Sequence, residues 1–472
     1  MNTIRLLSRL CFSATFLLLA VSTPPSAHGG DFRAGAASVD ITPKNGTPLA
    51  GYYHFRASTG VLDPLYAKAI VVEQDGERAV LVALDLVTTN REVVAAARKL
   101  IAERCGIPAD HVMISATHTH TGPQLPRGGL MDDITKANSP AAKAYADALP
   151  ELIAKAVSDA AAKLTPAKAS AAIGKAEGIS FNRRVINARG QLIWQPGKID
   201  PAVDRPAGPI DPDLGLVVFD AVEKRPAPLA AYVNFAMHPT SVGGGTRISA
   251  DFPGALCDVL AERKGRDMVT LFANGCCGNI NHTNYMPGAN QLRGPLETKR
   301  LGVALADVAS GTWDQLKPLT THAPRCRSTL VSLPRRKFSD EAIAKAQDVI
   351  RRMTTEKLGT VAMAEAVCVV DSTTRKDQPL EVEVQVIAFS DELAVVALPG
   401  EIFVELGLAI KKASPFKQTL IAELANGSMG YVPHRDAFPQ GNYEVVSARA
   451  EAGAGEMLVE AALKLLTDVR KQ

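Results

Sequence analysis

The sequence predicts an α/β fold in which mixed β-sheets are flanked by helices, and three observations support this prediction. Short apolar runs alternate with longer segments of helical periodicity. Some runs are joined by hairpin turns and others by strand-loop-helix units, a mixture that favours mixed sheets over a purely parallel one. The composition, with 46% hydrophobic and 21% charged residues, is that of a globular protein, and it excludes a disordered chain, a collagen and a coiled coil.

The individual elements follow from the spacing of apolar residues. Strands are predicted at 39–43, 69–72, 79–84, 112–116, 214–219, 229–235, 268–272, 381–389 and 393–398, and helices at 90–104, 139–163, 340–357 and 450–470. The sequences Gln-Asp-Gly-Glu at 74–77 and Ser-Asp-Glu at 390–392 predict hairpin turns. Residues 185–212 are rich in glycine and proline and predict a long loop that borders a site. The length of 472 residues fits two or three domains or one large unit with insertions.

The charge balance argues against nucleic acid as a partner. The chain contains 52 Lys and Arg against 49 Asp and Glu, which gives a formal net charge of +3. Arg5 and Arg9 lie in the N-terminal segment, which holds no acid, so the rest of the chain is nearly neutral. It also has no long basic run, and we therefore expect no nucleic-acid binding.

Residues 1–29 have the features of an export signal. Arg5 and Arg9 precede an apolar run at 10–21, and small residues and prolines follow, so we expect cleavage near the end of this segment. The alternative interpretation is an ordinary buried first helix. After cleavage, residues 30–472 form one catalytic domain of a secreted or periplasmic protein.

Export allows disulfides but does not require them in a chain of this size. Of the seven cysteines, Cys11 is lost with the signal. Cys276 and Cys277 could supply a thiol nucleophile, but adjacent cysteines more often pack in the core or pair with distant partners such as Cys257 or Cys326.

Candidate chemical groups follow directly after predicted strands, where α/β folds build their sites. His118, His120 and His238 each lie just past a strand, and Glu401 follows a Pro-Gly pair. Residues two apart on an extended segment point in opposite directions, so His118 and His120 can share a metal only if the chain bends. Otherwise one histidine binds the metal, and the other contacts a metal ligand without binding the metal itself. The residues alone indicate an exported metalloenzyme.

Each candidate also has a plain structural interpretation. The paired histidines could belong to a Thr-rich turn, and Glu401 could be a first-turn carboxylate at the start of a helix. Asp85 could orient a ligand histidine or cap a strand. His434 could contact the metal or the substrate, although a surface loop is the more ordinary place for it.

Several segments resemble, in their order and separation, the neutral/alkaline (non-lysosomal) ceramidases. These segments are 35–43, 115–123 (SATHTHTGP), 181–183 (FNR), 235–241 (FAMHPTS), 399–401 (PGE) and the block 431–443. The resemblance runs from about residue 33 to 470 and implies the fold of the ceramidase catalytic domain. It also implies a zinc amidase that hydrolyses the N-acyl bond of ceramide to a fatty acid and sphingosine.

The resemblance further implies a Zn2+ site and the residues around it. Its metal ligands fall on His118, His238, Glu401 and Tyr431, and its catalytic residues on the substrate side fall on His120, Arg183 and Tyr443. Imidazoles and a carboxylate are a known ligand set for catalytic zinc, which activates water near neutral pH. His120, Arg183 or Tyr443 then stabilises the oxyanion or protonates the leaving amine. Arg183 could instead pair with an acid of the predicted long loop.

Two departures from the family bear on the substrate. Asn279 and Asn281 stand where the family has an aspartate and a serine, so a mechanism that requires that serine hydroxyl does not transfer. The sequence also ends about where the catalytic domain of the family ends, without the β-sandwich that many members add. This favours a more soluble N-acyl amide over a membrane-embedded lipid.

We therefore predict an exported, zinc-dependent amide hydrolase that acts on ceramide or a related N-acyl amide. Its expected partner is a lipid or small-molecule amide, with peripheral membrane contact as an additional expectation. The alternatives are a zinc esterase or lactonase on the same scaffold, and a non-catalytic binding protein with a degenerate site.

Overall fold

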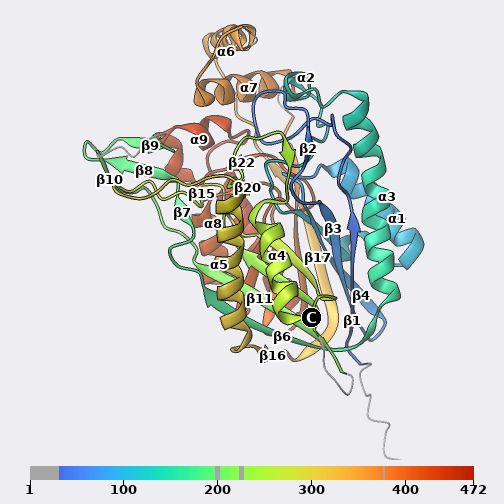
Figure 1. Ribbon diagram of the computed structural model, residues 1–472. Coiled ribbons are helices and arrows are strands. Elements are labelled where there is room, and N and C mark those ends of the chain that lie inside the picture. The colour runs from blue at the N-terminus through green and yellow to red at the C-terminus, as the bar shows by residue number, and fades with distance from the viewer. Residues whose placement is uncertain (1–30, 197–201, 223–227, 354, 376–377) are drawn as a thin grey trace, which may run out of the picture.

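The structure is a computed structural model that describes residues 31–196, 202–222, 228–353, 355–375 and 378–472. The predicted export signal lies outside these ranges. Within them, two main β-sheets enclose a central apolar core, and helices cover the outer faces of both sheets (Figure 1). The prediction of an α/β fold with mixed sheets and flanking helices is confirmed.

The larger sheet has nine strands within the described ranges, in the order β14-β12-β11-β6-β1-β3-β4-β5, with β16 paired to β6. Its strands are β1 (Arg33–Asp40), β3 (Tyr66–Gln74), β4 (Glu77–Leu84), β5 (Val112–Ala116), β6 (Thr165–Lys175), β11 (Asp213–Ala221), β12 (Pro228–Phe235), β14 (Val269–Asn274) and β16 (Lys317–Pro318). The pairs β4–β5 and β12–β14 are parallel, and the other neighbours are antiparallel.

The smaller sheet packs against the larger one across the central core. It consists of β17 (Thr321–Leu333), β18 (Leu380–Ser390), β19 (Leu393–Ala397) and β21 (Gln418–Ala422), in this order. Short pairs and triplets of strands lie outside the main sheets: β2 (Gly60–Val61), β7 (Phe181–Asn182), β8 (Arg184–Asn187), β9 (Leu192–Trp194), β10 (Val203–Pro206), β13 (Arg247–Ile248), β15 (Ile280–Asn281), β20 (Glu401–Ile402) and β22 (Tyr431–Val432).

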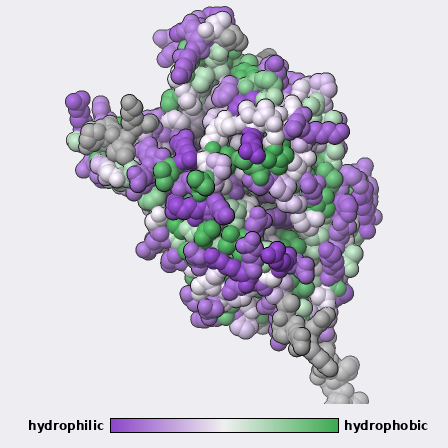
Figure 2. All heavy atoms as spheres, viewed as in Figure 1, coloured by the Kyte–Doolittle hydropathy of each residue, from purple (hydrophilic) through white to green (hydrophobic). Residues whose placement is uncertain are grey.

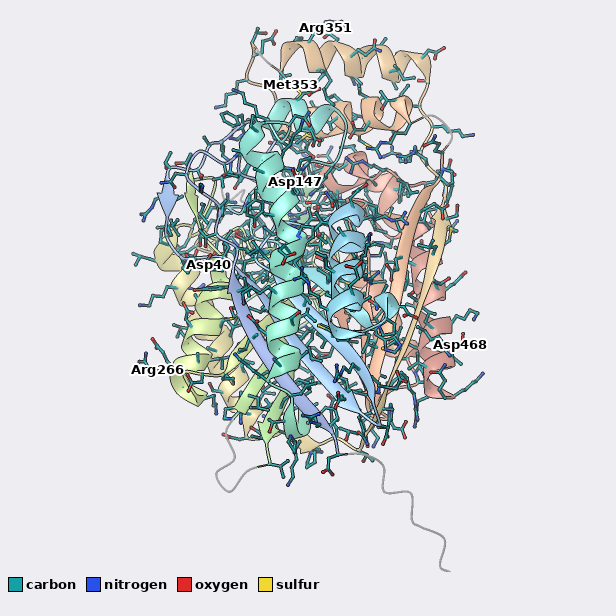
Figure 3. The ribbon with its side chains drawn as sticks, turned by 90° about the vertical axis from the view of Figure 1, so that its right-hand side faces the viewer. Asp40, Asp147, Arg266, Arg351, Met353 and Asp468 are labelled. Atoms are coloured by element: carbon teal, nitrogen blue, oxygen red, sulfur yellow. The ribbon has the colours of Figure 1, made fainter. Side chains whose placement is uncertain are left out.

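Helices form the outer layers. The larger sheet is covered by α1 (Arg91–Cys105), α3 (Pro140–Ala162), α4 (Asp251–Lys264) and α5 (Pro295–Trp313), and the smaller sheet by α8 (Val404–Ala413) and α10 (Ala454–Arg470). Figure 3 shows α3, which carries Asp147, in front of the strands. In the same view Arg266 follows α4 on one side of the molecule, and Asp468 lies on α10 on the opposite side. Among the described residues, no helix is both long and apolar enough to cross a membrane.

Further helices gather at one end of the molecule. They are α2 (Leu130–Thr135), α6 (Asp340–Arg352), α7 (Thr360–Thr374), η2 (Arg435–Gln440) and α9 (Tyr443–Ser447). The short helix η1 (Ala109–His111) lies elsewhere and directly precedes β5. Helix α6 projects beyond the rest of the molecule, and hydrophilic side chains gather on it (Figure 2). Its apolar side chains pack against α7, so this projection is a two-helix unit.

Strand β4 illustrates why the sheets are buried on both faces. Val80, Val82 and Leu84 pack under α1 and α3, whereas Leu81 and Ala83 point into the central core. Neighbouring side chains on a strand point to opposite faces, so a run that is apolar at every position buries both. Burial of this apolar surface is the main favourable term in folding.

The predicted hairpin between β3 and β4 is confirmed. Asp75 and Gly76 have φ values of 55° and 82°, the left-handed conformation that a tight hairpin turn requires. Helix α1 likewise begins where expected, because the side chain of Asn90 accepts a hydrogen bond from the backbone N–H of Val93.

Several predicted boundaries are wrong. The strand expected at 39–43 ends at Asp40, whose carboxylate accepts a hydrogen bond from the Thr42 N–H and turns the chain. The expected long loop at 185–212 includes most of the small sheet β10-β8-β9. The helix expected at 340–357 ends at Arg352.

Ends of strands from both sheets meet at one place. The Ala116 N–H, at the end of β5, donates to the carbonyl of Leu424 (3.2 Å). The Glu423 N–H donates to the carbonyl of Asn274 at the end of β14 (2.9 Å). These contacts bring the segments after β5, β14 and β21 together. His118 and His120 follow β5, His238 follows β12, and Glu401 follows β19.

Candidate metal centre

His118 and His120 lie in a bent segment after β5. His118 has a φ of 77°, which is strained for a residue with a side chain, and its N–H donates to the carbonyl of Leu86 (2.8 Å). Its Nδ1 lies 2.6 Å from the carbonyl oxygen of Val87, which sets the direction of the ring. This is the bend that sharing a metal requires, and the Nε2 atoms of His118 and His120 lie 3.3 Å apart.

His238 reaches the same point from the end of β12. Its N–H donates to the carbonyl of Ile280 (3.1 Å), and its ring Nδ1 lies 2.7 Å from the carbonyl oxygen of Cys277. The side chain is fully buried. The loop after β14 therefore holds both the backbone and the ring of this histidine.

Glu401 and Tyr431 are neighbours on the parallel strands β20 and β22. One carboxylate oxygen of Glu401 lies 3.1 Å from the Nε2 of His238 and 3.4 Å from that of His118. The hydroxyl of Tyr431 lies 3.4 Å from the Nε2 of His238. Glu401 was expected at a helix start, but it lies in a strand, and α8 begins only at Val404. We call His118, His238, Glu401 and Tyr431 the donor cluster.

The donor cluster has the arrangement of atoms that a cation requires. A backbone carbonyl can only accept a hydrogen bond, so the Nδ1 atoms of His118 and His238 carry the protons. Their Nε2 atoms then face the carboxylate of Glu401 with lone pairs, which is unfavourable in a buried site unless a cation lies between them. The ring nitrogens of His118, His120 and His238 all lie within 4.8 Å of one another, so these residues could hold a metal ion.

Burial keeps the imidazoles of His120 and His238 neutral. It lowers the pKa of His238 to about 3, assisted by the nearby Arg183 and His118. Burial and the two neighbouring histidines also lower the pKa of His120 well below its ordinary value. Burial alone would raise the pKa of Glu401, but the facing His118 and His238 hold it well below its usual range. Neutral imidazoles and an ionised carboxylate are the forms that bind metal.

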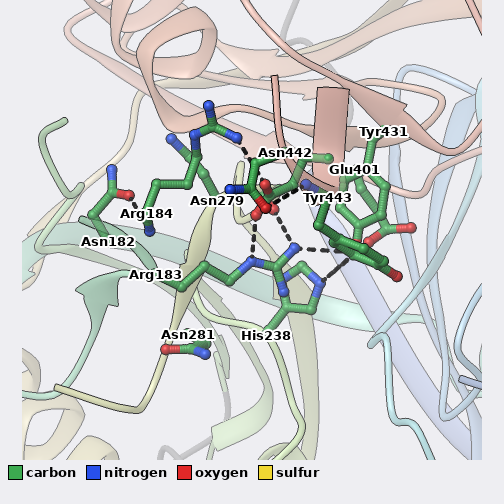
Figure 4. Close-up of polar contacts among 12 residues, drawn as sticks. Asn182, Arg183, Arg184, His238, Asn279, Asn281, Glu401, Tyr431, Asn442 and Tyr443 are labelled. Atoms are coloured by element: carbon green, nitrogen blue, oxygen red, sulfur yellow. Dashed lines mark hydrogen bonds and ion pairs between the residues drawn. The ribbon is translucent and has the colours of Figure 1, made fainter. Parts of the chain in front are cut away.

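Arg183 lies behind Tyr431 (Figure 4). Its guanidinium donates to the Tyr431 hydroxyl (3.1 Å), to the Gly278 carbonyl (2.6 Å) and to the carboxylate of Glu444 (2.9 Å). We expected Arg183 on the substrate side, but its side chain is only 3% exposed and does not line the open cavity. Its acidic partner comes from α9 and not from the predicted long loop.

Tyr443 continues the aromatic wall from Tyr431. Their ring centroids lie 5.4 Å apart in an edge-to-face arrangement, and Trp194 stacks on Tyr443 at 4.2 Å. Burial raises the pKa of Tyr431 and of Tyr443 well above the ordinary value, so both are neutral phenols without a metal. Tyr443 and His120 both line a cavity of about 480 Å³ that opens from the donor cluster.

The other sequence candidates lie outside the donor cluster. Asp85 accepts a hydrogen bond from the Tyr66 N–H (2.9 Å) and caps a strand, since Val87 and not Asp85 orients His118. His434 lies 3.6 Å from Glu405.

Asn279 and Asn281, which the resemblance places at the positions of an acid and a serine, have structural contacts. Asn279 donates to Glu405 (2.9 Å) and accepts from the Val404 N–H (2.9 Å). Asn281 donates to the Tyr285 hydroxyl (3.2 Å), and in Figure 4 no dashed line joins it to the group around Arg183.

The cysteines do not form a nucleophilic site. Burial raises the pKa of Cys276 and of Cys277 well above the ordinary value, which disfavours a thiolate. The six cysteines in the described part of the chain are free, so the pairing of Cys276 or Cys277 with Cys257 or Cys326 is wrong.

Two buried glutamates support the site and were missed in the sequence. Glu444 pairs with Arg183 and with Arg184 (2.9 Å each). Glu423 accepts hydrogen bonds from the Ile402 N–H (2.8 Å) and from the Cys277 thiol (2.8 Å). The available signal was an acid directly after the apolar strand β21, and a second acid directly after Tyr443.

A buried imidazole and carboxylate cluster at strand ends, opening into a cavity, defines a candidate metallohydrolase. The chain belongs to the neutral/alkaline non-lysosomal ceramidase family, whose N-terminal region it matches over residues 32–361. The family identified from the sequence is thereby confirmed.

Known relatives agree with this assignment. The chain is 34% identical over 126 residues to the neutral ceramidase of Pseudomonas aeruginosa, a match that covers 25% of this chain and 19% of the relative. The crystal structure of the Pseudomonas aeruginosa neutral ceramidase superimposes with a TM-score of 0.72 at 19% identity, over 94% of this chain and 75% of that one. A ceramidase complexed with C2 gives a TM-score of 0.70 at 19% identity, over 94% and 76%. These structures share the fold of this chain.

Proposed function

We propose that the protein is an exported zinc-dependent hydrolase that cleaves the C–N bond of an N-acyl amide, giving a carboxylic acid and an amine. The observation that carries the proposal is the donor cluster, in which ring nitrogens and a carboxylate converge on one point without protons between them. Family membership supports the reaction class. A bound zinc ion would act as a Lewis acid that polarises the amide carbonyl and makes water a nucleophile at neutral pH.

The protein's own groups would move the proton. The Nδ1 of His120 lies 3.2 Å from the carbonyl oxygen of Gly51, which leaves its Nε2 as the acceptor toward the donor cluster. Because the imidazole is neutral at pH 7, it accepts a proton from the attacking water and passes it to the leaving amine.

The phenols and Arg183 would stabilise developing negative charge. Tyr443 lines the cavity next to Tyr431 and is a hydrogen-bond donor for the oxyanion. Arg183 acts from behind, because its hydrogen bond to the Tyr431 hydroxyl favours negative charge on that oxygen.

The volume of the cavity, about 480 Å³, is sufficient for one apolar chain or for a small polar amide. Ceramide is the substrate that the family name suggests, and a related N-acyl amide fits the same reaction. Export is proposed from the N-terminal segment, with Arg5, Arg9 and the apolar run at 10–21.

The test is amide hydrolysis by the zinc-loaded chain. We expect amine release from a series of N-acyl amides, loss of turnover after chelation, and recovery when zinc is added back. His434→Ala is the matched control, because this histidine lies in a nearby loop outside the donor cluster. Turnover that survives complete metal removal would contradict the proposal.

A matched ester series separates the amidase from an esterase or lactonase. Amidase function predicts that amides with the same acyl chain are hydrolysed with a kcat/KM at least comparable to that of the esters. Ester turnover without amide turnover would replace the proposal by the esterase. Zinc binding without either activity would favour a binding protein.

A further inference from the structure

Arginines line the part of the cavity next to the donor cluster. Arg127 lies on the loop between β5 and α2, Arg375 directly after α7, and Arg449 after α9. We call these three residues the arginine wall. They line the same cavity as His118, His120, Glu401 and the two tyrosines, so a substrate at the donor cluster is within reach of them.

Arg127 differs from its two neighbours because its guanidinium has no hydrogen-bond or ion-pair partner in the described part of the chain. Arg449 forms an ion pair with Asp371 (3.2 Å), and Arg375 donates to the carbonyl of Gly128 (3.1 Å). Among the described residues, no hydrogen bond or ion pair is made by the side chain of Arg127, although Asp132 accepts from its backbone N–H (2.9 Å). The loop is fixed while its cation faces the cavity.

The acids of the cavity are engaged elsewhere or lie beside another arginine. Asp371 already accepts from Arg449 and from the Leu130 N–H, and Glu383 pairs with Arg98 (2.8 Å). Glu92 and Glu381 lie at the starts of α1 and β18, where Arg91 donates to the carbonyl of Glu381 (2.9 Å). Glu401 and Asp132 favour the charge on Arg127 from a distance, but no described carboxylate forms an ion pair with its guanidinium.

The side chain of Arg127 is exposed where it lines the cavity, so a ligand in the cavity can reach its guanidinium. The neighbouring Arg449 is a second cation and disfavours the charge on Arg127. An anionic group bound between these arginines would relieve that repulsion.

We propose that the arginine wall binds a carboxylate on the substrate, so that the enzyme prefers N-acyl amides with a free carboxylate, such as N-acyl amino acids. A guanidinium presents paired N–H groups in a plane that matches the two oxygens of a carboxylate. Arg127 is thereby a specificity-determining residue. The inference rests on the proposed amidase function and deepens it.

The kinetic test compares two amides that differ in charge but share one acyl chain. N-lauroylglycine carries a carboxylate and N-lauroylethanolamine is neutral. We expect a kcat/KM ratio of about tenfold or more in favour of N-lauroylglycine for the zinc-loaded enzyme, because charge-assisted hydrogen bonds are stronger than neutral ones. Arg127→Gln is expected to lower this ratio about tenfold, and Arg127→Lys to give an intermediate ratio. Arg91→Gln, which also removes a cavity arginine, is expected to change the ratio less than about twofold.

A binding measurement keeps the inference independent of turnover. N-decyl-N′-(carboxymethyl)urea and N-decyl-N′-(2-hydroxyethyl)urea are an anionic and a neutral analogue that resist hydrolysis. Titration calorimetry with the zinc-loaded protein should give tighter binding of the anionic urea, and Arg127→Gln should remove the difference. The preference should also weaken as salt is raised.

The outcomes separate the two proposals. If both ureas bind equally to the unmodified protein, the arginine wall does not recognise a carboxylate. The same conclusion follows if Arg127→Gln and Arg91→Gln change the preference for the anionic urea equally. If the amides are hydrolysed without a preference for the anionic one, the amidase stands and the subsite is refuted. If no amide is hydrolysed but Arg127 determines binding of the anionic urea, the subsite stands and the amidase is refuted.

Discussion

The donor cluster and the arginine wall line the same cavity, but they differ in how fully their side chains are paired. His118 and His238 are each held by a backbone carbonyl, and Arg183 behind them donates to Glu444, Gly278 and Tyr431. The guanidinium of Arg127 contacts no acceptor among the described residues. A site that holds one ion has its side chains fixed before the ion binds. A site that recognises a substrate has a recognition group without a partner until the substrate binds.

Prearrangement of the donor cluster requires support from distant parts of the chain. Glu423 connects the strand that carries Glu401 with the loop whose carbonyl holds His238, since it accepts from both Ile402 and Cys277. These supports are buried, so their substitution should be costly, whereas changes in the arginine wall should cost little.

Removal of a metal ligand should have the largest effect. In His238→Ala we expect zinc affinity to fall at least about a hundredfold. Substitution of a residue that only contacts the ligands already lowers metal affinity about 10–100-fold, and loss of a ligand itself should cost more. The measurement is zinc stoichiometry by mass spectrometry after dialysis against a weak chelator. His434→Ala should keep its zinc. Equal zinc content in both variants would contradict the donor cluster.

Breaking the support behind Tyr431 should come next. Glu444→Gln leaves Arg183 and Arg184 buried without a counter-charge, and loss of a partner from a buried ion pair costs about 3–5 kcal/mol. Urea unfolding followed by circular dichroism measures this loss. The exposed pair of Arg104 and Glu151 is the control, and Glu151→Gln should cost much less. Similar losses in the two variants would show that Glu444 is not essential to the support.

Acid should destabilise the protein through the buried His282, which follows β15. Burial lowers the pKa of His282 to about 4, while in the unfolded chain it takes up a proton near its ordinary pKa of 6.5. The unfolded state therefore binds more protons between these values, and stability falls as pH decreases from about 6.5 to 4, by up to about 3 kcal/mol. His282→Gln should flatten this part of the pH profile. Identical slopes for the two proteins would contradict a buried neutral imidazole.

The smallest effect is expected in the arginine wall. Arg127→Gln removes an unpaired cation, so the free energy of unfolding should stay within about 0.5 kcal/mol of the original value or rise slightly. Thermal unfolding measured by calorimetry tests this. A large loss of stability would show that Arg127 has a structural partner and would remove the contrast between the two parts of the cavity.

The elements that could be predicted are those with a strong local signal. The strand at 112–116 is an uninterrupted apolar run and was predicted with its exact ends. Strand β6 was missed because its small residues, such as Ala169 and Ala171, give no clear alternation. Strand β17 was missed because its exposed positions carry polar residues such as Arg327 and Thr329. Helices α4 and α5 begin with prolines and glycines that obscure their periodicity.

Part of the site could be predicted from local sequence, because the histidines and Glu401 directly follow predicted strands or a Pro-Gly pair. The two tyrosines came only from the family resemblance, and the structure brings the side chains of both groups together. Glu444 could not be found, because its partner Arg183 lies 261 residues away in the sequence. The same holds for Arg127, since its role depends on which carboxylates lie near it in space.

The most direct test of the donor cluster is anomalous X-ray diffraction at the zinc edge from crystals of the purified protein. We predict one strong peak about 2.0–2.2 Å from the Nε2 atoms of His118 and His238 and from a carboxylate oxygen of Glu401. No peak in crystals grown with added zinc, or a peak elsewhere in the molecule, would contradict a metal centre at these residues.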